Sequence, residues 1–183
     1  MNNTILLFIN GWAGKNSLLD MVMVFCASYL IYLVFLIAAT CLGYYIYTRE
    51  WTPVVYFIAS LVVTFGVLQL ATLLHFDHRP FMDHHLTQLV QHASGNSFPS
   101  DHTTAAAAIA LGLLFFTRFK KIGLLLLVAA CFIGFARIFV GVHYPADIVG
   151  GLLTALVGGG VIYALKDIFD PKQEHKVSFD PQK

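Results

Sequence analysis

Five stretches of this sequence are long and apolar enough to cross a lipid bilayer, which takes about 20 helical residues. Inside a bilayer the backbone must satisfy its own hydrogen bonds, and a separate apolar stretch does so by forming a helix. The sequence therefore predicts an all-α integral membrane bundle with about five transmembrane helices. We expect these spans at residues 21–47, 53–74, 102–119, 122–140 and 145–165.

The scarcity of charged residues supports a membrane environment. Of the 183 residues, 58% are hydrophobic and only 11% are Asp, Glu, Lys or Arg. A chain of this size cannot cover a water-exposed surface with so few charges. Ordinary cytosolic enzymes, nucleic-acid-binding proteins, disordered chains and secreted disulfide scaffolds are therefore excluded.

The two ends of the sequence differ from its apolar centre. Residues Ile5–Trp12 are too short and lack the basic residues of a signal peptide, so they predict a short N-terminal interfacial helix. Residues 166–183 are polar and predict a flexible tail. Because no internal repeat or linker interrupts the sequence, we expect one membrane-embedded domain over residues 1–183.

The basic residues predict how the chain is oriented. Eight of the eleven Lys and Arg residues lie on one side of the predicted spans, which the positive-inside rule places in the cytoplasm. The connections 75–101 and 137–144 then face outward. The eight residues are Arg49, Arg118, Lys120, Lys121, Lys166, Lys172, Lys176 and Lys183.

The outward connection from His75 to Asp101 is long and rich in histidine. Connections of this length are usually functional or disordered. A histidine cluster could bind a metal, but the spacing matches no metal-binding motif, so we expect no metal ligands here. We expect His84, His85 and His92 on a short amphipathic segment, whose apolar face is formed by Phe81, Leu86, Leu89 and Val90.

Three polar blocks stand at the outward ends of the predicted spans. They read Arg79-Pro80, Pro99-Ser100-Asp101-His102 and Arg137-x5-His143-x3-Asp147. One small volume at that face of the bundle can hold all three. The two arginines have planar guanidinium groups suited to phosphate, and a helix N-terminus capped by Ser100 or Asp101 attracts anions.

The third block also contains a candidate nucleophile. Asp147 lies four residues after His143, and Pro145 between them is typical of a first helical turn. A carboxylate that holds one ring nitrogen leaves the other nitrogen basic and nucleophilic. His102 is then free to give a proton to a leaving oxygen.

At these residues the sequence resembles the type 2 phosphatidic acid phosphatase superfamily, and within it the bacterial bacitracin-resistance undecaprenyl-diphosphatases. The superfamily pattern reads K-x6-R-P, P-S-G-H and S-R-x5-H-x3-D, in that order. The matching stretches here are FDHRPF, SFPSDHT and ARIFVGVHYPADIVGG, and the resemblance extends from about Leu18 to Leu165.

The resemblance implies a phosphatase that converts undecaprenyl diphosphate into undecaprenyl phosphate and phosphate at the outer face of the bacterial cytoplasmic membrane, with no metal or other cofactor. Such an enzyme supports recycling of the lipid carrier of peptidoglycan biosynthesis, and bacitracin resistance. By position, His143 would attack phosphorus and form a phosphohistidine, Asp147 would orient His143, and His102 would protonate the leaving group and later activate water. The phosphate oxygens would be held by Arg79, Ser100, Arg137 and the backbone N–H groups of Asp101 and His102.

Three positions depart from the superfamily pattern. Thr72 replaces the lysine, which removes one phosphate-binding cation unless His75 or His78 takes its place. Ala136 replaces the serine. Asp101 replaces the glycine, as in the S-D-H pattern of the undecaprenyl-diphosphatases, and would either cap the helix away from substrate or bind a proton or a second group.

Two alternative functions share part of this pattern. The same chemistry could act on phosphatidylglycerophosphate or phosphatidate, although the S-D-H pattern favours a polyprenyl diphosphate. A small lipid or ion transporter could use the same side chains to relay protons or bind headgroups. Transporters usually contain repeats or paired broken helices, which this sequence does not show.

Overall fold

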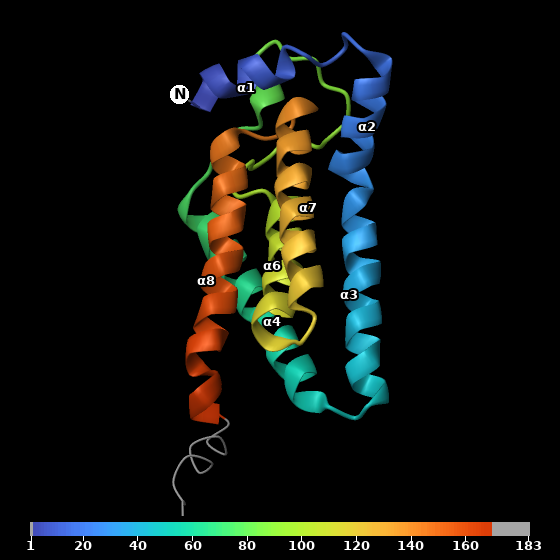
Figure 1. Ribbon diagram of the computed structural model, residues 1–183. Helices are drawn as coiled ribbons and strands as arrows, with labels where there is room; N and C mark the ends of the chain where they lie inside the picture. Colours follow the sequence, from blue (N-terminus) through green and yellow to red (C-terminus); the bar gives the residue numbers. More distant parts are fainter. Residues whose placement is uncertain (1, 170–183) are drawn as a thin grey trace, which may run out of the picture.

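The computed structural model describes residues 2–169, and these fold into a bundle of helices (Figure 1). The prediction of an all-α fold is confirmed. Helix α8 continues to Phe169, beyond the start of the predicted tail, and the rest of that tail lies outside the described residues. The helices are α1 (Asn2–Asn10), α2 (Ser17–Ser28), α3 (Leu30–Tyr47), α4 (Trp51–Leu74), α5 (Pro80–Asp83), α6 (Asp101–Phe116), α7 (Lys120–Phe139) and α8 (Pro145–Phe169).

The first and third predicted spans differ from the observed helices. The first is divided at Tyr29 into α2 and α3, and the Tyr29 N–H still donates to Phe25 O at 2.8 Å. The third is shorter than predicted because the chain leaves the helix at Thr117. There the Arg118 N–H donates to the Tyr45 hydroxyl at 2.8 Å instead of continuing the helical ladder.

The outer faces of the long helices are apolar. Helices α3, α4, α7 and α8 are long and apolar enough to cross a membrane, whereas α2 and α6 are apolar but shorter. Only 17% of an apolar 18-residue stretch of α4 is buried inside the protein, and large side chains such as Leu73 and Phe65 are exposed. Exposed apolar surface of this extent requires a lipid environment.

Helix α6 forms the centre of the bundle, packed against α3, α4, α7 and α8. Its alanine-rich face is buried, with Ala106, Ala107 and Ala110 fully inaccessible. Small residues allow helices to approach closely in membranes, where no hydrophobic effect drives them together. At Gly158 of α8 the helices approach so closely that even an alanine would not fit, since a Cβ there would lie 2.5 Å from the Thr64 Cα of α4.

Most of the described basic residues lie at one end of the bundle, and the three polar blocks lie at the opposite end. Among residues 2–169, Arg49, Arg118, Lys120, Lys121 and Lys166 all lie at the end where α3 meets α4, α6 meets α7 and α8 finishes (Figure 1). The three polar blocks and α1 lie at the other end. The predicted sorting of basic residues is therefore observed for the part of the chain that the structure describes.

Helix α1 lies across this second end and is tied to it by Asn10 (Figure 1). The Asn10 amide nitrogen donates to Thr87 O at 2.9 Å and to Phe139 O at 2.8 Å, while its oxygen accepts from the Thr87 N–H at 3.0 Å. Trp12 is exposed, as expected for an interfacial segment. One buried amide thus joins α1, the long connection and the end of α7.

The long connection between α4 and α6 is mostly irregular, so the prediction of an amphipathic segment is only partly correct. Helix α5 covers four residues, and the chain that follows forms no helix. Its apolar side chains enter two clusters rather than one face, Leu89 and Val90 packing near Val140 and Leu86 near Tyr144. The Leu89 N–H donates to Val140 O at 3.2 Å, which fixes this chain against the end of α7.

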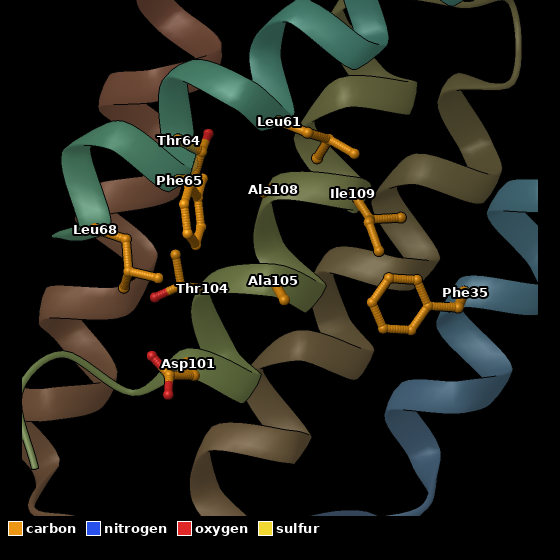
Figure 2. A pocket seen from close by; sticks show the side chains of 10 residues that line it. All are labelled: Phe35, Leu61, Thr64, Phe65, Leu68, Asp101, Thr104, Ala105, Ala108 and Ile109. Carbon is orange, nitrogen blue, oxygen red and sulfur yellow. The ribbon is translucent and has the colours of Figure 1, made fainter.

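An apolar groove opens between α3, α4 and α6 (Figure 2). Asp101, the first residue of α6, lies at one end of the groove. The groove therefore begins beside the polar end of the bundle and continues along its apolar flank. It is lined by Phe35, Leu61, Thr64, Phe65, Leu68, Asp101, Thr104, Ala105, Ala108 and Ile109.

Candidate active site

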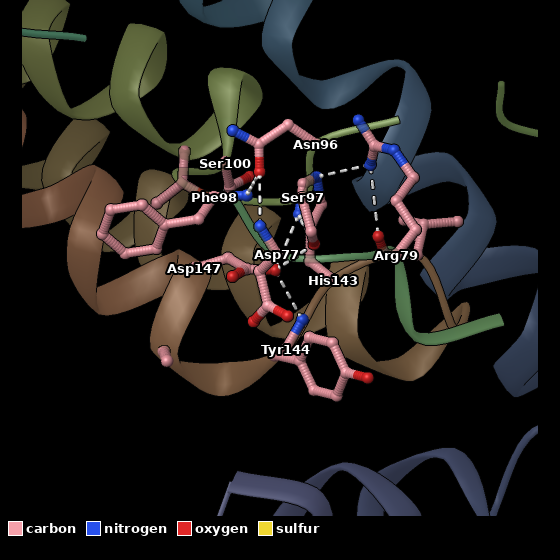
Figure 3. Close-up of polar contacts among 12 residues, drawn as sticks. Asp77, Arg79, Asn96, Ser97, Phe98, Ser100, His143, Tyr144 and Asp147 are labelled. Atoms are coloured by element: carbon pink, nitrogen blue, oxygen red, sulfur yellow. Dashed lines mark hydrogen bonds and ion pairs between the residues drawn. The ribbon is translucent and has the colours of Figure 1, made fainter. Parts of the chain in front are cut away.

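His143 and Asp147 form a buried pair at the turn from α7 to α8 (Figure 3). Pro145 begins α8, so Asp147 lies in the first helical turn and faces back towards the histidine. The His143 Nδ1 lies 3.2 Å from Asp147 Oδ2, and the Tyr144 N–H donates to the same oxygen at 2.8 Å. The predicted contact between residues four apart is present.

The neighbours of His143 determine which ring nitrogen carries the proton. Arg79 Nη1 lies 3.3 Å from His143 Nε2, and the same nitrogen donates to Val142 O at 3.2 Å. A guanidinium group can only donate, so Nε2 must present its lone pair. The proton therefore resides on Nδ1 and is donated to Asp147, which leaves Nε2 as the nucleophilic atom.

Burial keeps the His143 ring neutral. It lowers the pKa of His143 below the ordinary histidine value, because a charged ring loses its solvation in this site. The hydrogen bond to Asp147 acts in the opposite direction, and the charge of Arg137 again lowers the pKa. Burial also lowers the pKa of Arg79, an effect that the charges of Asp101 and Asp147 oppose.

The two arginines are buried with several donors unused. Arg137, in the last turn of α7, is 2% exposed, and its side chain makes one hydrogen bond to the described residues, a long one from Nη1 to Ala27 O at 3.4 Å. Its Nε and Nη2 atoms, and the Nε of Arg79, make no hydrogen bond within the described residues. Buried donors of this kind are costly unless a ligand accepts from them. Their arrangement suits an anion with several oxygen atoms.

The start of α6 is joined directly to α8. Ser100 takes the N-cap position, its N–H donates to Asp147 O at 3.1 Å, and its side chain makes no capping bond. The first N–H groups of the helix thus keep their capacity to bind an anion. This approach requires glycine in α8, since a Cβ at Gly150 would lie 2.3 Å from the Phe98 ring and one at Gly151 would lie 2.9 Å from Thr104 Oγ1.

His102 and Asp101 face different surroundings. His102 is half-buried in the first turn of α6, where the charges of Arg137, His143 and Arg79 act on its ring. Asp101 is exposed, and its side chain lies at the end of the apolar groove (Figure 2). Because Ser100 takes the cap position, Asp101 instead adds a negative charge to the first turn.

The structure brings the sequence-predicted site residues together at one end of the bundle. Arg79 and Asp147 contact the His143 ring, the Ser100 N–H donates to Asp147 O, and Asp101 is exposed. Within residues 2–169, no group of three or more His, Cys, Asp or Glu side chains could hold a metal ion. The predicted residues are Arg79, Ser100, Asp101, His102, Arg137, His143 and Asp147.

The expected substitutes for the family lysine contact other groups. The Thr72 hydroxyl donates to Leu68 O at 3.0 Å within α4. His75 packs against the Phe98 ring, and His78 is exposed and pairs with Asp83 at 3.5 Å. Within the described residues, the rings of the two histidines thus contact Phe98, Phe76 and Asp83.

Two residues near His143 were not predicted as parts of the site. The ring centre of His92 lies 6.4 Å from that of His143, and burial together with the charge of Arg79 lowers the pKa of His92. The Ser97 hydroxyl donates to Asp147 Oδ2 and lies 3.3 Å from His143 Nδ1 (Figure 3). No local spacing signals either residue, because their partners are remote in sequence.

Comparisons with known proteins agree with this architecture. The PAP2 superfamily model matches residues 51–169. The chain is 40% identical over 177 residues to undecaprenyl-diphosphatase BcrC of Bacillus subtilis strain 168, covering 93% of this chain and 87% of that protein. It is 33% identical over 162 residues to bacitracin transport permease protein BcrC of Bacillus licheniformis, covering 85% and 76%.

The crystal structure of Aquifex aeolicus LpxE superimposes with a TM-score of 0.71 at 23% identity, covering 89% of this chain and 94% of that one. This likeness supports the helical fold. Together with the apolar helices, these relationships identify a multi-pass membrane protein. The matched region contains all three polar blocks that surround His143, and the chain belongs to the PAP2 superfamily.

Proposed function

We propose that this protein is an undecaprenyl-diphosphate phosphatase. It hydrolyses the lipid to undecaprenyl phosphate and phosphate at the outer face of the bacterial cytoplasmic membrane. The observation that carries the proposal is the His143 Nε2 that Arg79 Nη1 contacts at 3.3 Å, together with buried donors of Arg79 and Arg137 that have no partner within residues 2–169. The B. subtilis relative named undecaprenyl-diphosphatase supports the choice of lipid.

The reaction proceeds in two displacements. In the first, His143 Nε2 attacks the terminal phosphorus, the bond to the bridging oxygen breaks, and His102 gives its proton to the departing undecaprenyl phosphate. In the second, His102 takes a proton from water, the oxygen attacks the phosphohistidine, and the bond between nitrogen and phosphorus breaks. Arg79 and Arg137 balance the charge on the phosphoryl oxygens, which is the main requirement of phosphoryl transfer.

The apolar groove offers a path for the lipid tail. It begins at Asp101, one residue from His102, and its walls are apolar side chains of α3, α4 and α6 (Figure 2). A diphosphate at the arginines would therefore extend its isoprenoid chain along α6 towards the bilayer. Release of undecaprenyl phosphate would return the lipid carrier to cell-wall synthesis and lower the amount of undecaprenyl diphosphate, which favours bacitracin resistance.

Phosphate release from purified protein tests the proposal. The protein in detergent with EDTA should release phosphate from undecaprenyl diphosphate faster than from phosphatidylglycerophosphate. His143→Ala should abolish release, whereas His85→Ala, at an exposed histidine outside the predicted site, should retain it. Equal release by the His143 variant, or none by the wild type, would refute the enzyme and favour a transporter. Preference for the glycerolipid would identify the alternative substrate.

A second measurement tests the path of the tail. Ala105→Phe narrows the groove beside α6 and should raise the KM for undecaprenyl diphosphate while leaving hydrolysis of a short, water-soluble isoprenyl diphosphate unchanged. Ala129→Phe fills a comparable apolar groove between α2, α3 and α7, remote from Asp101, and serves as the matched control. Equal effects of both substitutions on both substrates would contradict a tail in the first groove.

A further inference from the structure

The carboxylate of Asp147 has an uneven environment. Its Oδ2 accepts from His143 Nδ1, from the Tyr144 N–H and from the Ser97 hydroxyl, while its buried Oδ1 has no partner within the described residues. Three donors on one oxygen fix the rotation of the carboxylate. Two of them come from the turn before α8, and the third, Ser97, comes from the long connection before α6 (Figure 3).

Within residues 2–169, the Ser97 hydroxyl makes no hydrogen bond other than those to His143 and Asp147. Its backbone N–H donates to Asp77 O at 2.8 Å, so the backbone pairing of this segment does not need the hydroxyl. Ser97 is 1% exposed, and in the part of the chain that the structure describes, the hydrogen-bond partners of its hydroxyl are His143 and Asp147 alone. A buried hydroxyl that serves only this pair points to a role in the pair.

Asn96 sets the position of Ser97. The Asn96 amide nitrogen donates to Thr72 O at 3.2 Å and to His75 O at 3.0 Å, at the end of α4. Its oxygen accepts from the Asp77 N–H at 3.0 Å and the Phe98 N–H at 3.1 Å. These four bonds hold the backbone on either side of Ser97 and so direct its hydroxyl towards Asp147.

We infer that Ser97 is a positioning residue for phosphoryl transfer, whose hydroxyl holds Asp147 in the rotation that orients His143 and shares the negative charge of the carboxylate. The inference rests on the proposed role of His143 as nucleophile. With the hydroxyl present, Asp147 attracts the His143 proton less strongly, and the ring stays neutral with Nε2 free. Without it, the carboxylate charge acts on the imidazole with less competition.

The effect of Ser97 on Asp147 can be distinguished from the effects of the other groups around His143, because those groups carry or can carry positive charge. Besides Asp147, the titratable or charged groups that face the ring come from α6, α7 and the two segments of the long connection. They are all cations or potential cations, so Ser97 is a neutral group that moderates the single anion in contact with the ring. The groups are His102, Arg137, Arg79 and His92.

Ser97→Ala tests the inference with little change in volume. We expect kcat to fall about 10- to 100-fold, as for loss of a hydrogen bond to a charged group, with little change in KM. The acid limb of the pH–rate profile should move to higher pH by about one unit, because the His143 proton is bound more tightly. Ser97→Cys, which keeps a weak donor, should recover part of both effects. Ser60→Ala removes another buried hydroxyl, which bonds within α4, and should change neither.

A titration of His143 separates this inference from the proposed function. Histidine labelled with ¹⁵N can be followed by NMR in detergent, with His143→Gln to identify the signal. If Ser97→Ala protonates His143 at higher pH than the wild type, the inference is supported even where undecaprenyl diphosphate is not hydrolysed. If kcat falls while the acid limb and the titration stay unchanged, or if nothing changes, Ser97 has no positioning role and the inference is refuted.

Discussion

Replacing Arg137 by methionine should separate activity from stability. The methionine keeps the apolar stem and much of the volume of the side chain but removes every donor. In the wild type, Nε and Nη2 of Arg137 are buried with no hydrogen-bond partner among the residues that the structure describes, and Nη1 makes one long bond. The guanidinium is therefore unfavourable to the folded protein alone and useful only when an anion is bound.

The magnitudes follow from these two donors. A hydrogen bond to a charged group contributes about 1.5–3 kcal/mol, so losing two to phosphate costs about 3–6 kcal/mol, or about 10²- to 10⁴-fold in kcat/KM. A buried unsatisfied donor costs about 1–3 kcal/mol, so removing two stabilises the substrate-free protein by about 2 kcal/mol or more. For a chain of this length that corresponds to a rise in Tm of about 4–8 °C.

Phosphate release and thermal unfolding in detergent, each with and without inorganic phosphate, provide the assay. Phosphate should raise the Tm of the wild type and have little effect on Arg137→Met. The control is Arg118→Met, at the opposite end, where the guanidinium lies over the Tyr44 ring at 4.1 Å. It should retain activity and the response to phosphate. A variant that loses activity and Tm together, or that phosphate stabilises as much as the wild type, would show that Arg137 is a structural residue.

Three further predictions follow from the same geometry. Phosphate release should persist as the pH falls below about 6.5, the ordinary histidine pKa, because burial lowers the pKa of His143 and the neutral nucleophile survives. The stability of the fold should decline as the pH falls below about 6.5, since His143 in the unfolded chain binds a proton at higher pH than in the folded protein. An acid limb above about pH 6.5 in the pH–rate profile would contradict the lowered pKa of His143. Asn10→Ala removes three hydrogen bonds and should lower the Tm by about 3–18 °C and slow phosphate release, whereas Asn3→Ala on the same helix should do neither. Gly150→Ala places a Cβ 2.3 Å from the Phe98 ring and should cost about 1–3 kcal/mol of stability together with most of the activity. Gly160→Ala, where nothing lies within 4 Å, is the matched control, and equal losses in both glycine variants would argue against the close approach of α8 to the Phe98 ring.

The sequence predicted those features that repeat or that lie close together in the chain. The apolar spans are visible because each helix carries its own hydrophobicity, and the pair His143 and Asp147 is visible because one helical turn separates them. The break at Tyr29 was missed because the residues on both sides are equally apolar. Hydropathy indicates which residues favour lipid, but it does not indicate where one apolar helix ends and the next begins.

Contacts between remote segments could not be predicted. Ser97 lies 50 residues from Asp147 in sequence, and its role depends on how Asn96 holds the connection against α4. The histidines of that connection were grouped by proximity in sequence, yet only His92 lies beside the His143 ring. The connection follows the shape of two apolar clusters at the bundle end, which its own sequence does not specify.

The bonds of Asn10 impose an order on the maturation of the protein. Its partners Thr87 and Phe139 lie 77 and 129 residues further along the chain, so a ribosome must complete α7 before α1 can dock. Docking of α1 fixes the chain just before His143, so this side of the site takes its final form only after α7 has been made.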